Sequence, residues 1–213
     1  MKNILIIGMG KFGEHLALKL KSLGDEVCIV DDNAEKIAAL SNKITNAYVA
    51  DCTNIDSLKD LGIKQYDVCV VAIGENFQSS LEITALLKEL HAKKIVAKAN
   101  SEIQSKFLTM AGADDIIYPE YDSAEKLAVI CDSSKLFDFI SISDKIGIYE
   151  IQPKKAWIGK ALGDLDIRNK FHINIVAIKI DEDVDIPSAD YVFTGQEHLF
   201  VIGSQSNILK LTK

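Results

Sequence analysis

The sequence predicts an α/β protein in which a doubly wound parallel sheet precedes a smaller α+β domain. Short β-branched runs alternate with helical segments up to about residue 118, which is the signature of repeated βαβ units. The apolar runs, such as residues 4–7 and 68–73, are nearly continuous, as expected for strands that helices cover on both faces. After Pro119 the alternation stops, which indicates a second domain.

The first domain is predicted to contain parallel strands joined by helical crossovers. Apolar runs rich in Val and Ile are expected to form the strands, and the longer segments between them the helices. The strands are expected at 3–7, 26–30, 47–50, 68–73, 95–99 and 115–118. The helices are expected at about 11–23, 35–40, 57–61, 76–90 and 102–111.

The rest of the chain predicts a connecting helix and a small α+β domain. An amphipathic stretch at about 123–137 is expected to form the connecting helix. Turn signals stand at Pro153, Pro187 and Gly195. Strands are expected at 140–143, 147–151, 173–180 and 198–202, and a helix at 162–170. The expected division is 1–121 for the first domain, 122–139 for the connecting helix and 140–213 for the second domain.

Composition excludes several classes of protein. The chain has 213 residues, of which 48% are hydrophobic and 26% charged, which excludes a disordered protein. No apolar run approaches the roughly 18 to 20 residues that a membrane helix needs. The net charge of −7 argues against nucleic acid or anionic lipid as the main partner. The first residues lead into a strand without the features of a signal peptide, so a cytoplasmic location is expected.

The cysteines show no metal-ligand spacing. None of Cys28, Cys52, Cys69 and Cys131 forms a Cys-x-x-Cys pair, and two of them lie in apolar, strand-like runs. A thiol in such a run behaves as a small hydrophobic group. We therefore expect buried thiols rather than a metal site or disulfides.

A glycine-rich motif, GMGKFG, runs from Gly8 to Gly13 between the first strand and the first helix. This context is typical of the Rossmann dinucleotide-binding turn. Gly8 permits a tight turn, Gly10 lets the backbone approach a pyrophosphate, and Gly13 allows the helix to pack closely on the sheet. The helix N-terminus supplies unpaired N–H donors to a phosphate. A Rossmann-like nucleotide site is the prediction, and a purely structural glycine turn is the alternative.

Further polar residues follow the next strands. Asp31 ends the second strand, 18 residues after Gly13, where a carboxylate can bond both ribose hydroxyls and would repel a 2′-phosphate. This favours NAD(H) or an adenosine nucleotide over NADP. Asp32 either joins it at the ribose or caps the following helix. Loops at 51–53 and 72–76 fall at the carboxyl ends of strands, where open α/β sheets bind ligands.

No catalytic centre is evident beside this loop, and the protein is predicted not to be an enzyme. A dehydrogenase would need a proton-transferring group and a substrate domain. His15, His91, His172 and His198 are scattered, so surface or packing roles are expected. The alternatives are an NAD-dependent oxidoreductase with a small substrate domain and a redox-sensing NAD(H)-binding regulator of transcription. The net acidity and the lack of a basic recognition helix disfavour the regulator.

The chain resembles the RCK family, regulators of potassium conductance, in the form of the single-unit, Ktr-type regulatory subunit of potassium uptake. Four blocks carry the resemblance: GMGKFG from Gly8, VDDNAEK from Val30, VAIGENFQSS from Val71 and GADDIIYPE from Gly112. A fifth, DLDIRNKFHINIVAI from Asp164, matches the small C-terminal domain in which the family binds cyclic di-AMP.

The resemblance implies a cytosolic homodimer that assembles into an octameric ring beneath a membrane potassium-translocating subunit. Another cation transporter, such as an antiporter, is the alternative partner. The implied ligand of the first domain is ATP or ADP, or NAD(H). Its implied contacts are Gly8, Gly10, Lys11, Phe12 and Gly13 around the phosphates, Asp31 and Asp32 at the ribose, Asp51 and Cys52 near the adenine, and Ile73, Gly74, Glu75 and Asn76 across the cleft.

Two further positions are implied near the phosphates. Lys98 matches a phosphate-side lysine, with a solvated strand end as the alternative. Glu120 matches a carboxylate that holds a divalent cation, Mg²⁺ or Ca²⁺, at the dimer interface; the alternative is an acid at a helix N-terminus. The family commonly has arginine where Lys11 stands. Lysine keeps the charge but loses the planar fork of donors.

The implied cyclic di-AMP site lies in the second domain. Its residues are Ile167, Arg168, Asn169, Asn174, Ile175 and Pro187. A guanidinium can bond phosphate or stack on adenine, and an asparagine can read the edge of the base. Arg168, the single arginine of the chain, is the expected anion anchor, and a cation at a helix C-terminus is the alternative.

Overall fold

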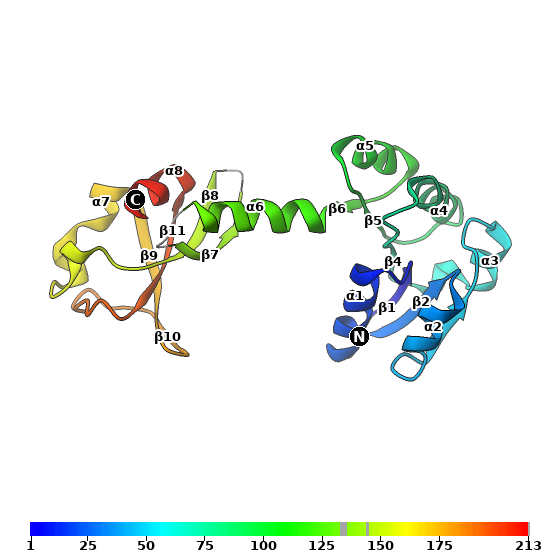
Figure 1. Ribbon diagram of the computed structural model, residues 1–213, viewed down its shortest axis with the longest axis horizontal. Helices are drawn as coiled ribbons and strands as arrows, with labels where there is room; N and C mark the ends of the chain where they lie inside the picture. Colours follow the sequence, from blue (N-terminus) through cyan, green and yellow to red (C-terminus); the bar gives the residue numbers. More distant parts are fainter. Residues whose placement is uncertain (133–135, 144, 213) are drawn as a thin grey trace. The chain divides into compact units, whose positions relative to one another are not determined.

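The computed structural model describes residues 1–132, 136–143 and 145–212 and divides into two compact units (Figure 1). The first unit comprises Met1–Tyr121 and the second Asp122–Lys213. Within the described ranges, no helix is both long and apolar enough to cross a membrane. The two units are described in turn.

The first unit is a six-stranded parallel sheet with the strand order β3-β2-β1-β4-β5-β6. This confirms the predicted doubly wound sheet, with most element ends within two residues of expectation. The strands are β1 (Asn3–Ile7), β2 (Glu26–Asp31), β3 (Asn46–Val49), β4 (Val68–Val71), β5 (Ile95–Lys98) and β6 (Asp115–Ile117). The helices are α1 (Lys11–Ser22), α2 (Ala34–Leu40), α3 (Ile55–Asp60), α4 (Phe77–Glu89) and α5 (Glu102–Ala111), with a 3-10 turn, η1, at Ile63–Gln65.

Both faces of the inner strands of this sheet are buried. In β1, Leu5 and Ile7 belong to the core on one face and Ile4 and Ile6 to the core on the other. This explains the continuous apolar run, because successive side chains of a strand point to opposite faces. The chain order reverses between β1 and β4, which lie side by side in the sheet. Such a switch point opens a crevice at the carboxyl ends of the strands.

The helices of this unit begin in two different ways. Asn33, Asn54, Asn76 and Ser101 cap α2 to α5, each accepting a backbone N–H bond from the first turn. The alternative role of Asp32 as a cap is therefore wrong, because Asn33 holds that position. In contrast, α1 begins after Gly10 without any side-chain cap. Its first amides stay available to a ligand.

The second unit is built on a five-stranded antiparallel sheet with the order β10-β9-β11-β8-β7. Its core surrounds Trp157, Phe193 and Leu199. The strands are β7 (Leu136–Ser141), β8 (Ile146–Ile151), β9 (Ile173–Ile180), β10 (Asp183–Asp185) and β11 (His198–Ser204). The helices are α7 (Ile167–Phe171) and α8 (Gln205–Thr212), with 3-10 turns η2 (Lys155–Trp157) and η3 (Leu162–Leu165).

The predicted connecting helix is wrong at both ends. Helix α6 runs from Pro119 to Cys131, and it begins at Pro119 because proline suits the first helical position. Of the predicted stretch, residues 133–135 lie outside the described residues. Leu136 already belongs to β7, where it pairs with Ile151. The expected domain start at 140 therefore falls inside a strand. The helix prediction failed here because a buried Leu136 beside an exposed Phe137 fits strand alternation as well as a helical period.

Two other predictions for the second unit need correction. The helix expected at 162–170 is two short pieces, η3 and α7, separated at Asp166, whose φ of 49° is left-handed. Strand β10 and helix α8 were not expected, because the polar residues around 183–185 and 205–207 carry no apolar period. Strand β9 agrees with its predicted bounds.

A buried carboxylate holds the turn before β11. Glu197 is 0% exposed and accepts hydrogen bonds from the backbone of Thr194 and Gly195 and from the Thr194 hydroxyl, at 2.6 to 2.9 Å. Burial alone would raise the pKa of Glu197, but these hydrogen bonds hold it below its usual value. The charged form of this residue thus stabilises the second unit.

We predict that Glu197→Gln destabilises the second unit by about 1 to 3 kcal/mol, since charge-assisted bonds are lost in a buried site. Because the folded pKa of Glu197 is lowered, its contribution is present above the unfolded pKa of about 4.3 and is lost as pH falls through the folded value. Fluorescence of Trp157, the chain's single tryptophan, during urea unfolding measures this. Equal stability of both proteins at pH 7 would contradict it.

Candidate functional site

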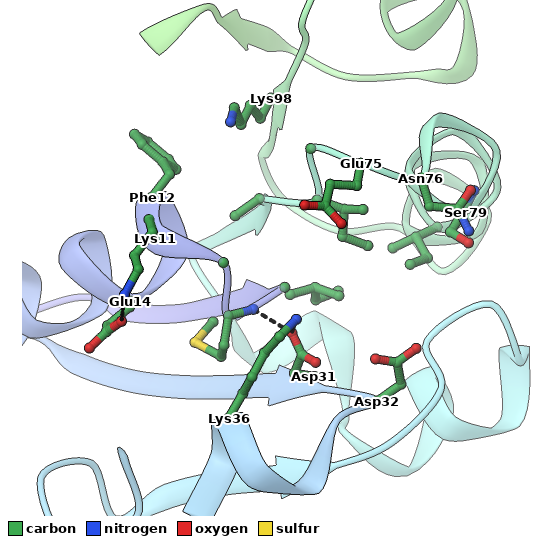
Figure 2. Close-up of a pocket in the computed structure, with 18 of the residues that line it drawn as sticks. Lys11, Phe12, Glu14, Asp31, Asp32, Lys36, Glu75, Asn76, Ser79 and Lys98 are labelled. Carbon is green, nitrogen blue, oxygen red and sulfur yellow. Dashed lines mark hydrogen bonds and ion pairs between the residues drawn. The ribbon is translucent and has the colours of Figure 1, made fainter. Parts of the chain in front are cut away.

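A pocket of about 1260 Å³ opens at the carboxyl ends of the strands of the first unit (Figure 2). It is larger than the roughly 300 to 1,000 Å³ of common ligand sites, so it has room for a nucleotide. The loops after β1 to β5 and the start of α6 line it. Of the residues predicted for the first domain, the lining includes Gly8, Gly10, Lys11, Phe12, Asp31, Asp32, Asp51, Cys52, Ile73, Gly74, Glu75, Asn76, Lys98 and Glu120, but not Gly13.

The three motif glycines meet three different constraints. Gly8 has a φ of 99°, and a Cβ there would lie 2.8 Å from the Ile73 side chain. A Cβ on Gly13 would lie 2.0 Å from the carbonyl oxygen of Gly8, which no backbone could accommodate without shifting. A Cβ on Gly10 would meet nothing within 4 Å. Gly8 and Gly13 therefore shape the turn, and Gly10 keeps the surface open to a ligand.

Asp31 braces this turn. Its Oδ2 accepts a 2.6 Å bond from the Met9 N–H and a 3.3 Å bond from the Lys36 ammonium, and its Oδ1 accepts a 2.9 Å bond from the Asn33 N–H. The side chain is only 5% exposed. Burial alone would raise the pKa of Asp31, but these donors hold it below its usual range.

This brace leaves Asp31 less free for a ribose than the sequence suggests. Each carboxylate oxygen accepts about two hydrogen bonds, so Oδ2 is filled and Oδ1 keeps one vacancy. Asp32 is exposed and also lines the pocket, so its carboxylate is the more accessible of the two (Figure 2). The role of Lys36 was missed, although a lysine in the first turn of the helix that follows a strand-end aspartate is a signal the sequence contains.

The side of the pocket beyond β3 combines a hydrogen-bonded carboxylate with a buried thiol. Asp51 bonds both the backbone and the hydroxyl of Thr53, at 2.9 and 2.7 Å. Cys52 is buried, and burial, with the nearby Asp51 charge as a second cause, raises the pKa of its thiol to about 12. It therefore forms an inert, apolar floor.

The expectation of buried, unbonded thiols is confirmed for three of the four cysteines. Cys28, Cys52 and Cys69 are buried and free. Cys131 is also free, but it is exposed near the end of α6. The buried prediction is wrong there because an apolar-looking helix end in the sequence is solvated in the structure.

The opposite wall centres on Lys98. Its ammonium lies 2.6 Å from the Glu120 carboxylate, and the hydrogen bond from Lys98 holds the pKa of Glu120 below its usual value. Asn100 donates a hydrogen bond to the Gly74 carbonyl and joins the two loops. Asn100 was missed, although it follows the fifth strand as the other lining loops follow theirs. At the start of α1, the Lys11 side chain is 93% exposed, and its ammonium lies 3.9 Å from the Glu14 carboxylate.

The side chains described do not by themselves form a divalent-cation site at Glu120. Within these ranges, no group of three or more His, Cys, Asp or Glu side chains could hold a metal ion. Glu120 also lies against an ammonium, which repels a cation. The metal role of Glu120 stays a prediction that would need ligands from elsewhere.

The residues predicted for cyclic di-AMP lie on α7, β9 and the segment after β10. Arg168, Asn169 and Asn174 are exposed, and the Asn169 amide donates to Asp166 at 2.6 Å. Ile167 is 5% exposed and packs in the core, so its side chain is not presented at the surface. Ile175 and Pro187 are half-buried. This assignment remains a prediction.

Residues 4–119 match the family model of the TrkA-N domain, and residues 146–213 match that of the TrkA-C domain. Ktr system potassium uptake protein C of Bacillus subtilis is 37% identical over 213 residues, which covers 100% of this chain and 96% of that protein. Ktr system potassium uptake protein A of the same organism is 35% identical over 208 residues, covering 97% and 94%.

Solved structures share the fold. The GsuK RCK domain has a TM-score of 0.69 at 20% identity, over 99% of this chain and 47% of that one. The GsuK channel bound to NAD has a TM-score of 0.67 at 19% identity, over 97% and 38%. The Kef C-terminal domain of Shewanella denitrificans in its AMP-bound form has a TM-score of 0.52 at 26% identity, over 60% and 77%.

We predict that Gly13→Ala lowers the stability of the first unit and that Gly10→Ala leaves it nearly unchanged. Gly13→Ala should destabilise the first unit by about 3 kcal/mol, because its Cβ overlaps a backbone oxygen. Gly10→Ala should change stability by less than about 1 kcal/mol, because its Cβ meets no atom. Hydrogen exchange of the β1 amides measures both. Equal protection in the two variants would contradict this reading of the turn.

Proposed function

This chain belongs to the Ktr family of potassium-uptake regulatory subunits, which combine a TrkA-N with a TrkA-C domain, and we propose that its first unit senses ATP, ADP or NAD(H). The observation that carries the proposal is the uncapped N-terminus of α1, which opens into the pocket behind Gly10. The solved relatives named above with bound NAD and AMP support an adenine nucleotide.

The lining accounts for each part of such a ligand. Phosphates would lie against the free amides at the start of α1, where the helix dipole favours an anion. Lys11 and Lys98 would supply positive charge from two sides. The ribose would meet Asp32 and the remaining vacancy of Asp31, and the adenine would lie near Asp51 and Cys52.

Regulation rather than catalysis is the proposed role. None of the four histidines is among the residues that line the pocket. The buried Cys52 thiol is too weakly acidic to serve as a nucleophile. The relatives named above are potassium uptake proteins, so the proposed partner is a membrane potassium-translocating subunit, with this chain at its cytoplasmic side.

The proposed mechanism is a shift between two states of an oligomer. A homodimer that assembles into an octameric ring would transmit pocket occupancy to the translocator. A ligand with equal affinity for both states would shift nothing, so ATP and ADP must bind the two states differently. Cyclic di-AMP in the second unit, around Arg168 and Asn174, would bias the same equilibrium.

We predict that calorimetry detects binding of at least one of ATP, ADP and NADH to the full chain, and that Gly10→Ala weakens it about tenfold or more. The reason is that a Cβ on Gly10 occupies the space a phosphate needs while the fold is kept. If none of the three binds, the sensor proposal is wrong. Turnover of NADH with a panel of small substrates would instead favour an oxidoreductase.

We predict that Arg168→Ala weakens cyclic di-AMP binding to the full chain by about tenfold or more, because the guanidinium can bond a phosphate or stack on adenine. Lys210→Ala on α8, also an exposed cation, is the matched control and should bind as the unchanged chain does. Calorimetry on the three proteins makes the comparison. Unchanged affinity in Arg168→Ala would remove this arginine from the site.

A further inference from the structure

The two members of the Lys98–Glu120 ion pair differ in their exposure to solvent. The Lys98 side chain is only 10% exposed, whereas the Glu120 side chain is 69% exposed. Glu120 is the one hydrogen-bond partner of the Lys98 ammonium among the described residues. A desolvated ammonium with a single partner needs an anion far more than a solvated carboxylate needs a cation. Lys98 therefore holds Glu120, and a better anion could take its place.

The surroundings of Lys98 direct it toward the pocket. The ammonium lies beside Gly74, where a Cβ would come within 3.2 Å of it, and the Asn100 amide fixes that loop. Both members of the pair line the pocket. In Figure 2, Lys98 extends from its strand on the wall facing Phe12 and Lys11. A ligand whose phosphates lie at the start of α1 can extend toward this ammonium.

We propose that Glu120 is an internal competitor of the ligand's phosphate: it occupies Lys98 in the free pocket and is displaced when a phosphate reaches that ammonium. This inference rests on the proposed nucleotide site and adds a residue that regulates it. A phosphate with up to two negative charges attracts Lys98 more strongly than one carboxylate does. A phosphate and Glu120 at the same ammonium also repel each other.

Displacement of Glu120 has a consequence along the chain. Glu120 is the second residue of α6, which continues without interruption to Cys131, among residues of the second unit. The ion pair ties the first turn of this helix to β5, the strand that ends at Lys98. Ligand binding would release that tie. The exchange of Glu120 for phosphate at the Lys98 ammonium would thereby couple the pocket to α6. This coupling needs no rearrangement of the hydrophobic core.

The test compares ATP affinity, with EDTA present, in the unchanged chain, Glu120→Gln and Glu120→Ala. Removal of the competitor is expected to tighten binding about fivefold or more in both variants. Glu102→Gln is the matched control, because Glu102 pairs with Lys106 on α5 at 2.8 Å outside the pocket, and it should bind as the unchanged chain does. Unchanged or weaker binding in both Glu120 variants would overturn the inference.

A second measurement tests the ion pair itself. In a Lys98→Met background no ammonium is left to compete for, so Glu120→Gln is expected to tighten ATP binding by less than about twofold. The same tightening with and without Lys98 would overturn the exchange. If Glu120 were instead a cation ligand, Glu120→Gln would leave the affinity in EDTA unchanged and lower it with Mg²⁺. Failure of the unchanged chain to bind any nucleotide would refute the proposed site itself, a distinguishable result.

Discussion

The close approach of α1 to the turn after β1 is the constraint on which the first unit depends. Gly13 lies so near the Gly8 carbonyl that a Cβ would overlap it at 2.0 Å. This approach places the uncapped start of α1 at the crevice where the strand order switches. Asp31 then fixes the turn by bonding the Met9 amide at 2.6 Å. The turn at the start of α1 is thus held in place by contacts within the first unit.

The net acidity of the chain is compatible with the proposed anion site, because the donors are local. Residues 1–139 carry 15 basic and 21 acidic side chains, so the overall field opposes a phosphate. Asp31 contributes little to that field, since Lys36 and two backbone amides surround its carboxylate. Free helix amides and the Lys98 ammonium act within a few ångströms, where they outweigh distant charges that water screens.

The parallel sheet and most of the pocket could be predicted because they follow from local rules: apolar periodicity, glycine spacing and the position of loops after strands. The partners of each charge could not. The sequence predicted Asp31 to be a free ribose ligand. Its donors Met9 and Lys36, however, come from a loop and a helix, and the tertiary fold determines how these lie relative to Asp31. The pairing of Lys98 with Glu120, 22 residues apart, likewise depends on the tertiary structure. The break at Asp166 was missed because a left-handed aspartate leaves no periodic signal.

The proposed sensor must bind its ligand differently in two states. Contacts within the turn hold Gly8, Gly13 and Asp31 in place, so we expect these residues to contribute similarly to both states. The difference has to come from groups with a second partner available. Lys98 has one in the proposed exchange, in which Glu120 competes for it from the first turn of α6. On this proposal, affinity resides in the glycine turn, and discrimination between states resides in the exchangeable ion pair.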